Sequence, residues 1–292
     1  MHEDDYGLNT ISNYETCLKG NTNPVWGNKR ISKITTSLIR NYFKEGRKKW
    51  SKSHTKNMVK YIKKVLDHAV EEGYIDRNPM PRLKIKNNSK LKTVLNEKQV
   101  KTLLFKAREC RHPWYSIWAT ALFTGMRNGE LYSLRWEDVS FDQNLINVCS
   151  SWNKHDGFKS TKNGDDRYVE ISKPLKVILS ELQLRNLDSE YVLPRIVKWD
   201  KGEQARVLRE FLKEIELPEI RFHDTRACWA TLMLSKGVEP IKLMKMGGWS
   251  DLKTMERYIR QAGVDIKGIT ACLDDLHDPL TSTGKILSIV RG

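Results

Sequence analysis

The stretch SHTKNMVKYIKKVLDHAVEEG (Ser53–Gly73) carries the clearest helical pattern in this chain. Its apolar residues recur three and four positions apart, so they form one stripe on a helix. The stripe consists of Met58, Tyr61, Ile62, Val65, Leu66 and Ala69. Ser53 can cap the start of this helix, and Gly73 can end it. The pattern predicts an amphipathic helix that buries one face against other helices.

Basic residues dominate the opposite side of this helix and the segment before it. A short helix is expected around Ser37–Glu45, and the basic run KEGRKKWSK (Lys44–Lys52) continues it. Together these segments predict a helical bundle with one basic face, which suits contact with phosphates. The expected DNA-contacting residues are Lys44, Arg47, Lys48, Lys49, Lys52, Lys56, Lys60, Lys63 and Lys64. The alternative is a solvated lysine-rich surface, which is common for a single helix.

The charge of the chain is concentrated in the same region. The chain has 292 residues and a formal net charge of +15. Residues 1–93 hold 20 Lys and Arg against 9 Asp and Glu, whereas residues 94–292 hold 31 against 27. A local excess of this size favours a polyanionic partner, with nucleic acid ahead of an anionic membrane.

Several classes of protein are excluded. The start, MHEDDYGLNT, is acidic and has no apolar core of a secretory signal. The longest apolar run, YSIWATALF (Tyr115–Phe123), is about half of a membrane span. The five cysteines lie far apart and form no CxxC pair, so neither a zinc site nor a disulfide framework is indicated. We therefore expect a cytoplasmic protein that does not bind a membrane.

The chain divides into two domains, a linker and a tail. The segment RNPMPRLKIKNNSKLK (Arg77–Lys92) contains two prolines and no sustained periodicity, which is typical of a linker. The predicted organisation is a helical DNA-binding domain at 1–82, a linker at 83–94, a catalytic domain at 95–262 and a C-terminal tail at 263–292.

The second domain mixes helices and strands. One helix is expected to begin after Asn96, and a buried helix is expected to stop near Gly125. NLINVCSSW (Asn144–Trp152) has strand character, and Gly157–Ser172 predicts a hairpin around the Asn163-Gly164 dipeptide. Only helices are expected after it. The predicted fold class is mostly α, with a small antiparallel sheet in the catalytic domain and a helical N-terminal bundle.

The chain lacks the motifs of metal and nucleotide chemistry. It has no GxxxxGK[ST], no HExxH and no GxGxxG after a strand, and its histidines do not pair at metal-ligand spacing. No acidic cluster resembles a two-metal nuclease centre. We expect neither a metal nor a cofactor. An enzyme that acts on DNA without a metal must neutralise a phosphate with cationic side chains.

Four features could supply such side chains. They are Arg127 in TGMRNGEL (Thr124–Leu131), Lys162 beside the Asn-Gly turn, His223 and Arg226 in HDTR, and Trp249 with Tyr258 in GGWSDLKTMERYI (Gly247–Ile259). Taken singly, each has a structural alternative: a helix cap, a solvated turn residue, a core histidine or a packing aromatic residue.

Together and in this order, these residues resemble the tyrosine recombinases, the family that includes phage-type integrases. That family has an arginine in a T-G-x-R-x-x-E/D-L context, a hairpin lysine, H-x-x-R, a His or Trp after a Gly, and then a tyrosine. The spacings fit as well, with 26 residues from His223 to Trp249 and 9 more to Tyr258. The resemblance covers the second domain and extends to the first, with its EEGYIDRNPM exit (Glu71–Met80).

The resemblance implies a DNA strand transferase. Tyr258 would attack the scissile phosphorus, displace a 5′-hydroxyl and form a 3′-phosphotyrosyl bond, although a phenol with a pKa near 10 needs help to do so. Arg127 and Arg226 would clamp the phosphate oxygens. Trp249 would donate its N–H to the same oxygens, and His223 would take the tyrosine proton or hydrogen-bond the phosphate. Lys162 would protonate the leaving 5′-oxygen, and Glu130 would orient a neighbouring basic group.

The sequence departs from the family pattern in two ways. Position 249 is Trp where most members have His, and an indole cannot transfer a proton. The arm-binding domain that precedes the core-binding helices of many integrases is expected to be absent or truncated.

The resemblance also implies partners and a location. It implies double-stranded DNA as substrate, a homo-tetramer on two DNA sites, accessory DNA-bending or directionality proteins, and a nucleoid-associated place in a bacterial or phage-infected cell. The tail, with Ile266, Ile269 and Leu273, is expected to form a short helix that docks on a neighbouring protomer or packs in cis. Two alternatives stay open: a type IB topoisomerase, which relaxes supercoils, and a non-catalytic DNA-binding regulator.

Overall fold

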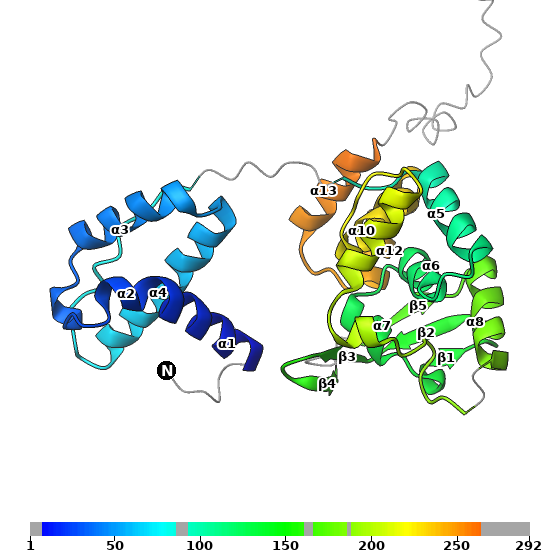
Figure 1. The fold of residues 1–292 in the computed structure, drawn as a ribbon, viewed down its shortest axis with the longest axis horizontal. Coiled ribbons are helices and arrows are strands. Elements are labelled where there is room, and N and C mark those ends of the chain that lie inside the picture. Colours follow the sequence, from blue (N-terminus) through cyan, green and yellow to red (C-terminus); the bar gives the residue numbers. More distant parts are fainter. Residues whose placement is uncertain (1–7, 86–92, 161–165, 186–187, 264–292) are drawn as a thin grey trace, which may run out of the picture.

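The computed structural model describes residues 8–85, 93–160, 166–185 and 188–263 (Figure 1). Within these ranges, strands occur only after residue 93, and each part of the chain has its own buried core. The predicted Lys162, most of the predicted linker and nearly all of the tail lie outside the described residues. The expected domain limits and the docking role of the tail therefore stay predictions.

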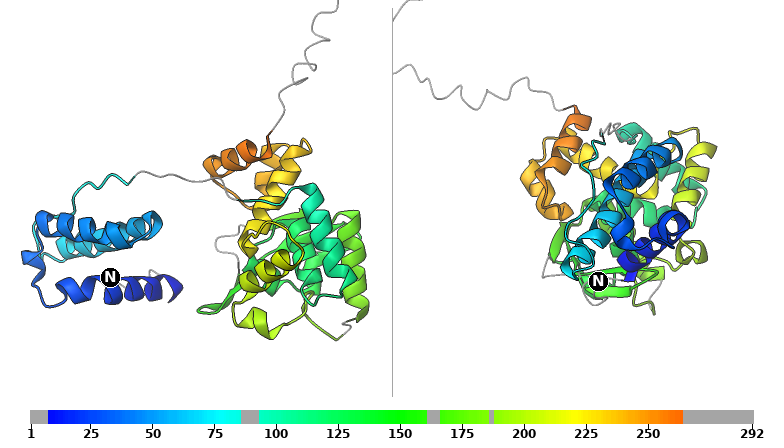
Figure 2. Two further views of the ribbon diagram at one scale, coloured as in Figure 1. Left: turned by 45° about the horizontal axis from the view of Figure 1, so that its top comes forward. Right: turned by 90° about the vertical axis from the view of Figure 1, so that its left-hand side faces the viewer.

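The first part of the chain is a small helical bundle. Its elements are α1 (Leu8–Cys17), a π-helical turn η2 (Leu18–Thr22), α2 (Asn23–Trp26), a 3₁₀ turn η3 (Ile31–Lys33), α3 (Thr36–Lys49) and α4 (Lys52–Glu71). Ile39 and Phe43 of α3 and Met58 of α4 are almost inaccessible to solvent and form the centre of its core. On the other side of α4 lies α1 (Figure 2), where the rings of Tyr14 and Tyr61 approach to 4.3 Å.

Two expectations for this bundle are corrected by the structure. The basic run is mostly part of α3, which extends to Lys49 rather than ending near residue 45. The N-cap of α4 is Ser51, not Ser53, because the Ser51 hydroxyl accepts a hydrogen bond from the His54 amide at 3.1 Å. Both serines precede the apolar stripe, so the pattern alone does not distinguish them.

The second part of the chain combines helices with two small sheets. Its helices are α5 (Glu97–Glu109), α6 (Tyr115–Thr124), α7 (Asn128–Ser133), η4 (Trp136–Asp138), α8 (Lys173–Arg185), α9 (Val197–Asp200), α10 (Gln204–Glu214), η6 (Phe222–Asp224), α11 (Thr225–Ser235), α12 (Pro240–Gly247) and α13 (Leu252–Ala262). Its strands are β1 (Val139–Ser140), β2 (Leu145–Val148), β3 (Ser150–Asn153), β4 (Gly157–Ser160) and β5 (Arg167–Glu170). This mostly helical architecture with antiparallel strands confirms the predicted fold class.

The strand pairing differs from the expected hairpin. β5 pairs with β2 in a three-stranded antiparallel sheet of order β1-β2-β5, whereas β4 pairs with β3 in a separate two-stranded sheet. The prediction that residues 157–172 form one hairpin is therefore wrong, and its Asn163-Gly164 turn lies outside the described residues. The hairpin that forms joins β3 to β4, with Gly157 at φ 70°. Turn-forming dipeptides indicate where a chain can reverse, but strand partners depend on long-range packing.

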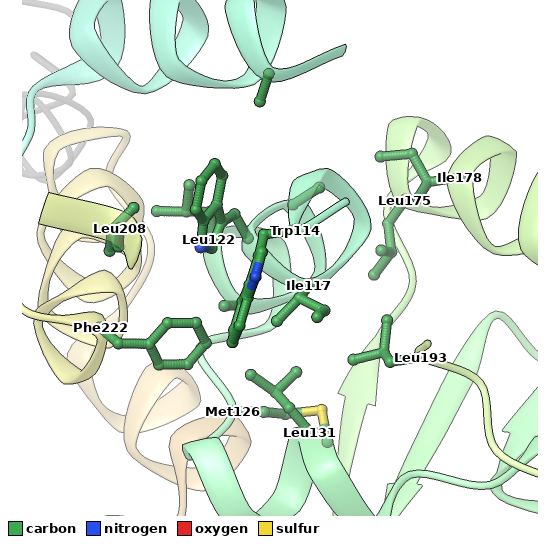
Figure 3. Close-up of a cluster of buried hydrophobic side chains, with 14 of the residues drawn as sticks. Trp114, Ile117, Leu122, Met126, Leu131, Leu175, Ile178, Leu193, Leu208 and Phe222 are labelled. Carbon is green, nitrogen blue, oxygen red and sulfur yellow. The ribbon is translucent and has the colours of Figure 1, made fainter. Parts of the chain in front are cut away.

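The core of this part surrounds α6 (Figure 3). α6 lies between α8, which contributes Leu175 and Ile178, and the region of α10 and η6, which contributes Leu208 and Phe222. A helix enclosed on all sides must be apolar all round, which explains the uninterrupted run in its sequence.

Two predicted helix boundaries in this part are confirmed. Asn96 caps α5 in a reciprocal capping box with Gln99. Gly125 ends α6 in the left-handed conformation, at φ 64°. None of the helices in the described part of the chain is long and apolar enough to cross a bilayer.

Candidate active site

The end of α12 presents three successive carbonyl groups to three arginines. The pairs are Arg167 Nε with the Met246 carbonyl at 2.8 Å, Arg226 Nη2 with the Gly247 carbonyl, and Arg127 Nη2 with the Gly248 carbonyl at 3.0 Å. The last carbonyls of a helix lack partners within it and carry the negative end of its dipole, so cations are stabilised there. The helix terminus thus gathers side chains from the N-cap of α7, from β5 and from α11 at one place.

Glu130 on α7 joins two of these arginines. Its buried carboxylate accepts bonds from Arg167 Nη1 and Nη2 at 3.0 and 2.6 Å, and from Arg127 Nη1 at 2.7 Å. It also accepts the Arg127 backbone amide at 2.7 Å, which closes the first turn of α7. Burial would raise the pKa of Glu130, but the hydrogen bonds and charges of Arg167 and Arg127 lower it to about 2. The carboxylate is therefore ionised at neutral pH and orients basic neighbours.

Arg226 lies beneath the indole of Trp249. Its side chain is 2% exposed, and its Nη1 donates to the Gly125 carbonyl at 2.6 Å. The guanidinium carbon sits 4.0 Å from the centre of the Trp249 ring, which is a cation–π contact. Burial, together with the positive charge of Arg127, lowers the pKa of Arg226 to about 9. The side chain still carries its positive charge at neutral pH.

Tyr258 also packs against the indole of Trp249. It faces inward from α13, is 6% exposed, and its ring centre lies 5.3 Å from that of Trp249. Trp249 in turn lies 6.0 Å from Trp229 of α11. Burial raises the pKa of Tyr258, although the charge of Arg226 acts in the opposite direction. A phenol in this environment needs a base or a stabilising cation before it can act as a nucleophile.

The expected site residues are described to different extents. Hydrogen bonds and aromatic contacts connect Arg127, Glu130, Arg226, Trp249 and Tyr258 into one cluster. His223 is exposed on η6, at the turn that opens α11 and carries Arg226. The position of Lys162 lies outside the described residues. The catalytic roles of all these residues stay predictions.

Arg167 is the member of this cluster that the sequence analysis missed. It is 7% exposed, and the burial of β5 alternates so that Arg167 and Val169 face inward while Tyr168 and Glu170 face outward. An arginine at an inward position of a strand was a signal in the sequence, since a buried guanidinium requires an anionic partner.

A cleft opens beside the cluster. It has a volume of about 1260 Å³, and its lining includes Arg127, Arg167, Lys242, Lys245 and Trp249. The lining also includes the carboxylates of Glu130 and Asp166, so its four cationic side chains exceed its anionic ones by two. This excess favours an anion, and guanidinium groups bind phosphate oxygens through paired hydrogen bonds. Within the described residues, no group of three His, Cys, Asp or Glu side chains is arranged to hold a metal ion.

The nine expected DNA-contacting residues all lie on α3 or α4. Lys56 and Lys64 are half-buried, and the others are exposed. Lys48 pairs with Glu45 at 2.7 Å and Lys63 with Asp67 at 2.9 Å. Exposed ion pairs of this kind contribute little to the stability of the fold. A phosphate could therefore replace either carboxylate as the partner of its lysine. Their contact with DNA stays a prediction.

Comparison with known proteins gives matches over both parts of the chain. The sequence pattern of the phage integrase family matches residues 93–263, and that of the phage integrase central domain matches residues 1–86. The integrase of Salmonella phage P22 is 23% identical over 211 residues, which are 70% of this chain and 53% of that protein. The ICEBs1 integrase of Bacillus subtilis is 25% identical over 222 residues, 70% of this chain and 60% of that protein. The chain thus spans little more than half the length of these relatives.

Two solved structures share the fold. The Tn1549 transposon integrase in complex with transposon right end DNA has a TM-score of 0.77 at 18% identity, covering 94% of this chain and 96% of that one. A lambda integrase tetramer bound to a Holliday junction has a TM-score of 0.69 at 15% identity, covering 90% of this chain and 74% of that one. At these identities the likeness concerns the fold.

Proposed function

The chain belongs to the phage integrase family of tyrosine recombinases, and we propose that it is a site-specific recombinase that cuts and rejoins double-stranded DNA. The observation that carries this proposal is the cluster at the end of α12. Two guanidinium groups that a phosphate could bridge, Arg127 and Arg226, meet there beside the indole of Trp249 and the phenol of Tyr258.

The reaction that these groups support is a transesterification. The Tyr258 hydroxyl attacks the scissile phosphorus, the bond from phosphorus to the 5′-oxygen breaks, and a 3′-phosphotyrosyl bond forms. The phenolic proton passes to a base, for which His223 is the candidate, and the 5′-oxygen takes a proton from Lys162. A 5′-hydroxyl of another strand reverses the step, so the bond energy is conserved and no cofactor is required.

Arg127 and Arg226 stabilise the negative charge that builds on the non-bridging oxygens of the phosphate. Arg127 is 45% exposed at the cleft and keeps N–H groups beyond those bonded to Glu130 and Gly248. Arg226 is covered by Trp249, so its full contact with a phosphate requires the indole to shift or the anion to enter beside it. Trp249 contributes a hydrogen bond and a packing surface but no proton.

The proposal assigns DNA binding to the basic helical bundle. It also includes the assembly of several copies of the chain on the DNA. The cationic side chains of α3 and α4 would contact backbone phosphates, which predicts binding that weakens steeply with salt. A homo-tetramer on two DNA sites accounts for strand exchange, and the tetrameric lambda integrase with the same fold supports it. Accessory DNA-bending proteins and a nucleoid location belong to the same proposal.

The test is formation of a covalent protein–DNA adduct. Wild-type protein is incubated with a nicked duplex taken from the ends of its own element, and adducts are resolved after denaturation in detergent. Tyr258→Phe is expected to bind this DNA with wild-type affinity and to form no adduct. An adduct in this variant, or none with wild-type protein, would refute the assignment.

The role of Lys162 has a separate test. Lys162→Ala should be slow on a phosphodiester but fast on a 5′-bridging phosphorothiolate, because a thiolate leaves without a proton. Equal defects on both substrates would remove Lys162 from the role of acid.

A further inference from the structure

We propose that Arg167 is a positioning residue of this reaction centre, which ties Glu130 to the end of α12 and thereby sets Arg127 and Trp249 for the scissile phosphate. The inference rests on the proposed function, because it assigns a role within that reaction. It adds to the centre an arginine that would not itself touch the phosphate.

The hydrogen bonds of Arg167 are all made within the protein. Its Nη1 and Nη2 bind the two oxygens of Glu130 in a bidentate pair, and its Nε binds the Met246 carbonyl at 2.8 Å. Each of its three nitrogens thus has a protein partner, and the side chain is 7% exposed. By contrast Arg127 is 45% exposed. Arg127 can therefore contact a ligand in the cleft, whereas Arg167 holds Glu130 and the end of α12 in place.

The carboxylate of Glu130 couples the two arginines directly. Its Oε1 accepts Nη1 of both Arg127 and Arg167, and its Oε2 accepts the Arg127 amide and Arg167 Nη2. A bidentate pair fixes direction as well as distance. Without Arg167, Glu130 would keep only the bonds from Arg127, and the Arg127 guanidinium could turn toward the carboxylate and away from the cleft.

Arg167 also supports the turn that carries Trp249. Gly248 adopts φ 63°, and a Cβ there would lie 3.0 Å from Arg167 Cδ. The stem of Arg167 therefore packs closely against the backbone directly before Trp249. Through Met246 on one side and Glu130 on the other, one side chain from β5 sets the spacing between α7 and α12.

The experiment compares Arg167→Met with a matched control, Arg206→Met, which removes an exposed arginine that pairs with Glu203 and Glu210. Both are tested on a nicked duplex that carries either a phosphodiester or a methylphosphonate at the scissile position. A methylphosphonate lacks one charged oxygen, so its reaction depends less on a correctly placed clamp.

Arg167→Met is expected to bind DNA as wild-type protein does and to form the Tyr258 adduct about 100-fold more slowly on the phosphodiester, the typical effect of a misplaced catalytic group. On the methylphosphonate the loss should shrink to less than about 10-fold, while Arg206→Met stays near wild type on both. Arg167→Lys keeps the positive charge but lacks the two parallel N–H donors of a guanidinium. Its rate on the phosphodiester should lie between those of Arg167→Met and Arg206→Met.

Two results would overturn the inference. One is a phosphodiester rate for Arg167→Met within about 3-fold of wild type. The other is an equal loss on both substrates by a variant whose urea unfolding matches wild type, which would mean that Arg167 does not act through the phosphate clamp. If Arg167→Met does not fold, the two-substrate comparison is made with Arg167→Lys. Failure of wild-type protein to form the adduct would instead refute the proposed function, so the two failures are distinguishable.

Discussion

The substitution Glu130→Gln tests the electrostatics of the cluster most directly. It keeps the shape of the side chain and removes the charge that Arg127 and Arg167 share. The remaining amide still accepts hydrogen bonds through its oxygen, but its NH₂ group faces an arginine N–H. The buried guanidinium of Arg167 then lacks an anionic partner, which is the costly way to break a buried ion pair.

The magnitude follows from the pKa of the carboxyl group. The pKa of Glu130 is about 2, against 4.5 for an unperturbed glutamate. One pKa unit corresponds to about 1.4 kcal/mol, so the ionised carboxylate contributes about 3 kcal/mol to the free energy of unfolding. Because the pKa is lowered in the folded state, this contribution is fully present above pH 4.5 and is lost as the pH falls toward 2.

The assay is urea unfolding of wild type and Glu130→Gln, followed by tryptophan fluorescence. The variant should be less stable by about 3 kcal/mol at pH 7, and the difference should fall to about 1 kcal/mol at pH 3. Glu45→Gln is the control, because it removes an exposed carboxylate that pairs with Lys48, and its unfolding curve should match wild type. A difference below about 1 kcal/mol at pH 7, or one that does not change with pH, would refute the reasoning.

Three further outcomes are expected. Gly125→Ala should lower the melting temperature strongly, because φ is 64° there and a Cβ would lie 2.2 Å from the Trp229 ring; an unchanged melting temperature would contradict this packing. Ser51→Ala should cost about 1 kcal/mol in urea unfolding whereas Ser53→Ala costs much less, and the reverse order would restore Ser53 as the cap. Adduct formation should proceed unchanged in EDTA, and a strict requirement for a divalent cation would count against the proposed chemistry.

Local features of the fold were predictable from the sequence. The cap at Asn96 depends on a side chain that bonds to its own backbone, and the stop at Gly125 depends on a backbone conformation that glycine adopts readily. The helix at 173–185 shows as apolar residues at helical spacing. The candidate site residues Arg127, His223, Arg226, Trp249 and Tyr258 could also be selected from the sequence, because their order and spacing carry the family resemblance. Where two local solutions were close, as at Ser51 and Ser53, the pattern alone did not choose between them.

Partners that lie far apart in the sequence were decided only by the tertiary structure. β5 pairs with β2 rather than β4, and this register turns Arg167 inward toward Glu130. No periodicity indicates that the carbonyls of residues 246–248 would meet three arginines. Such a convergence depends on how α7, β5, α11 and α12 pack, because a buried guanidinium is stable only where its partners are brought to it. The sequence by itself determined which groups are available for the reaction, and the packing of these elements determined which of them meet.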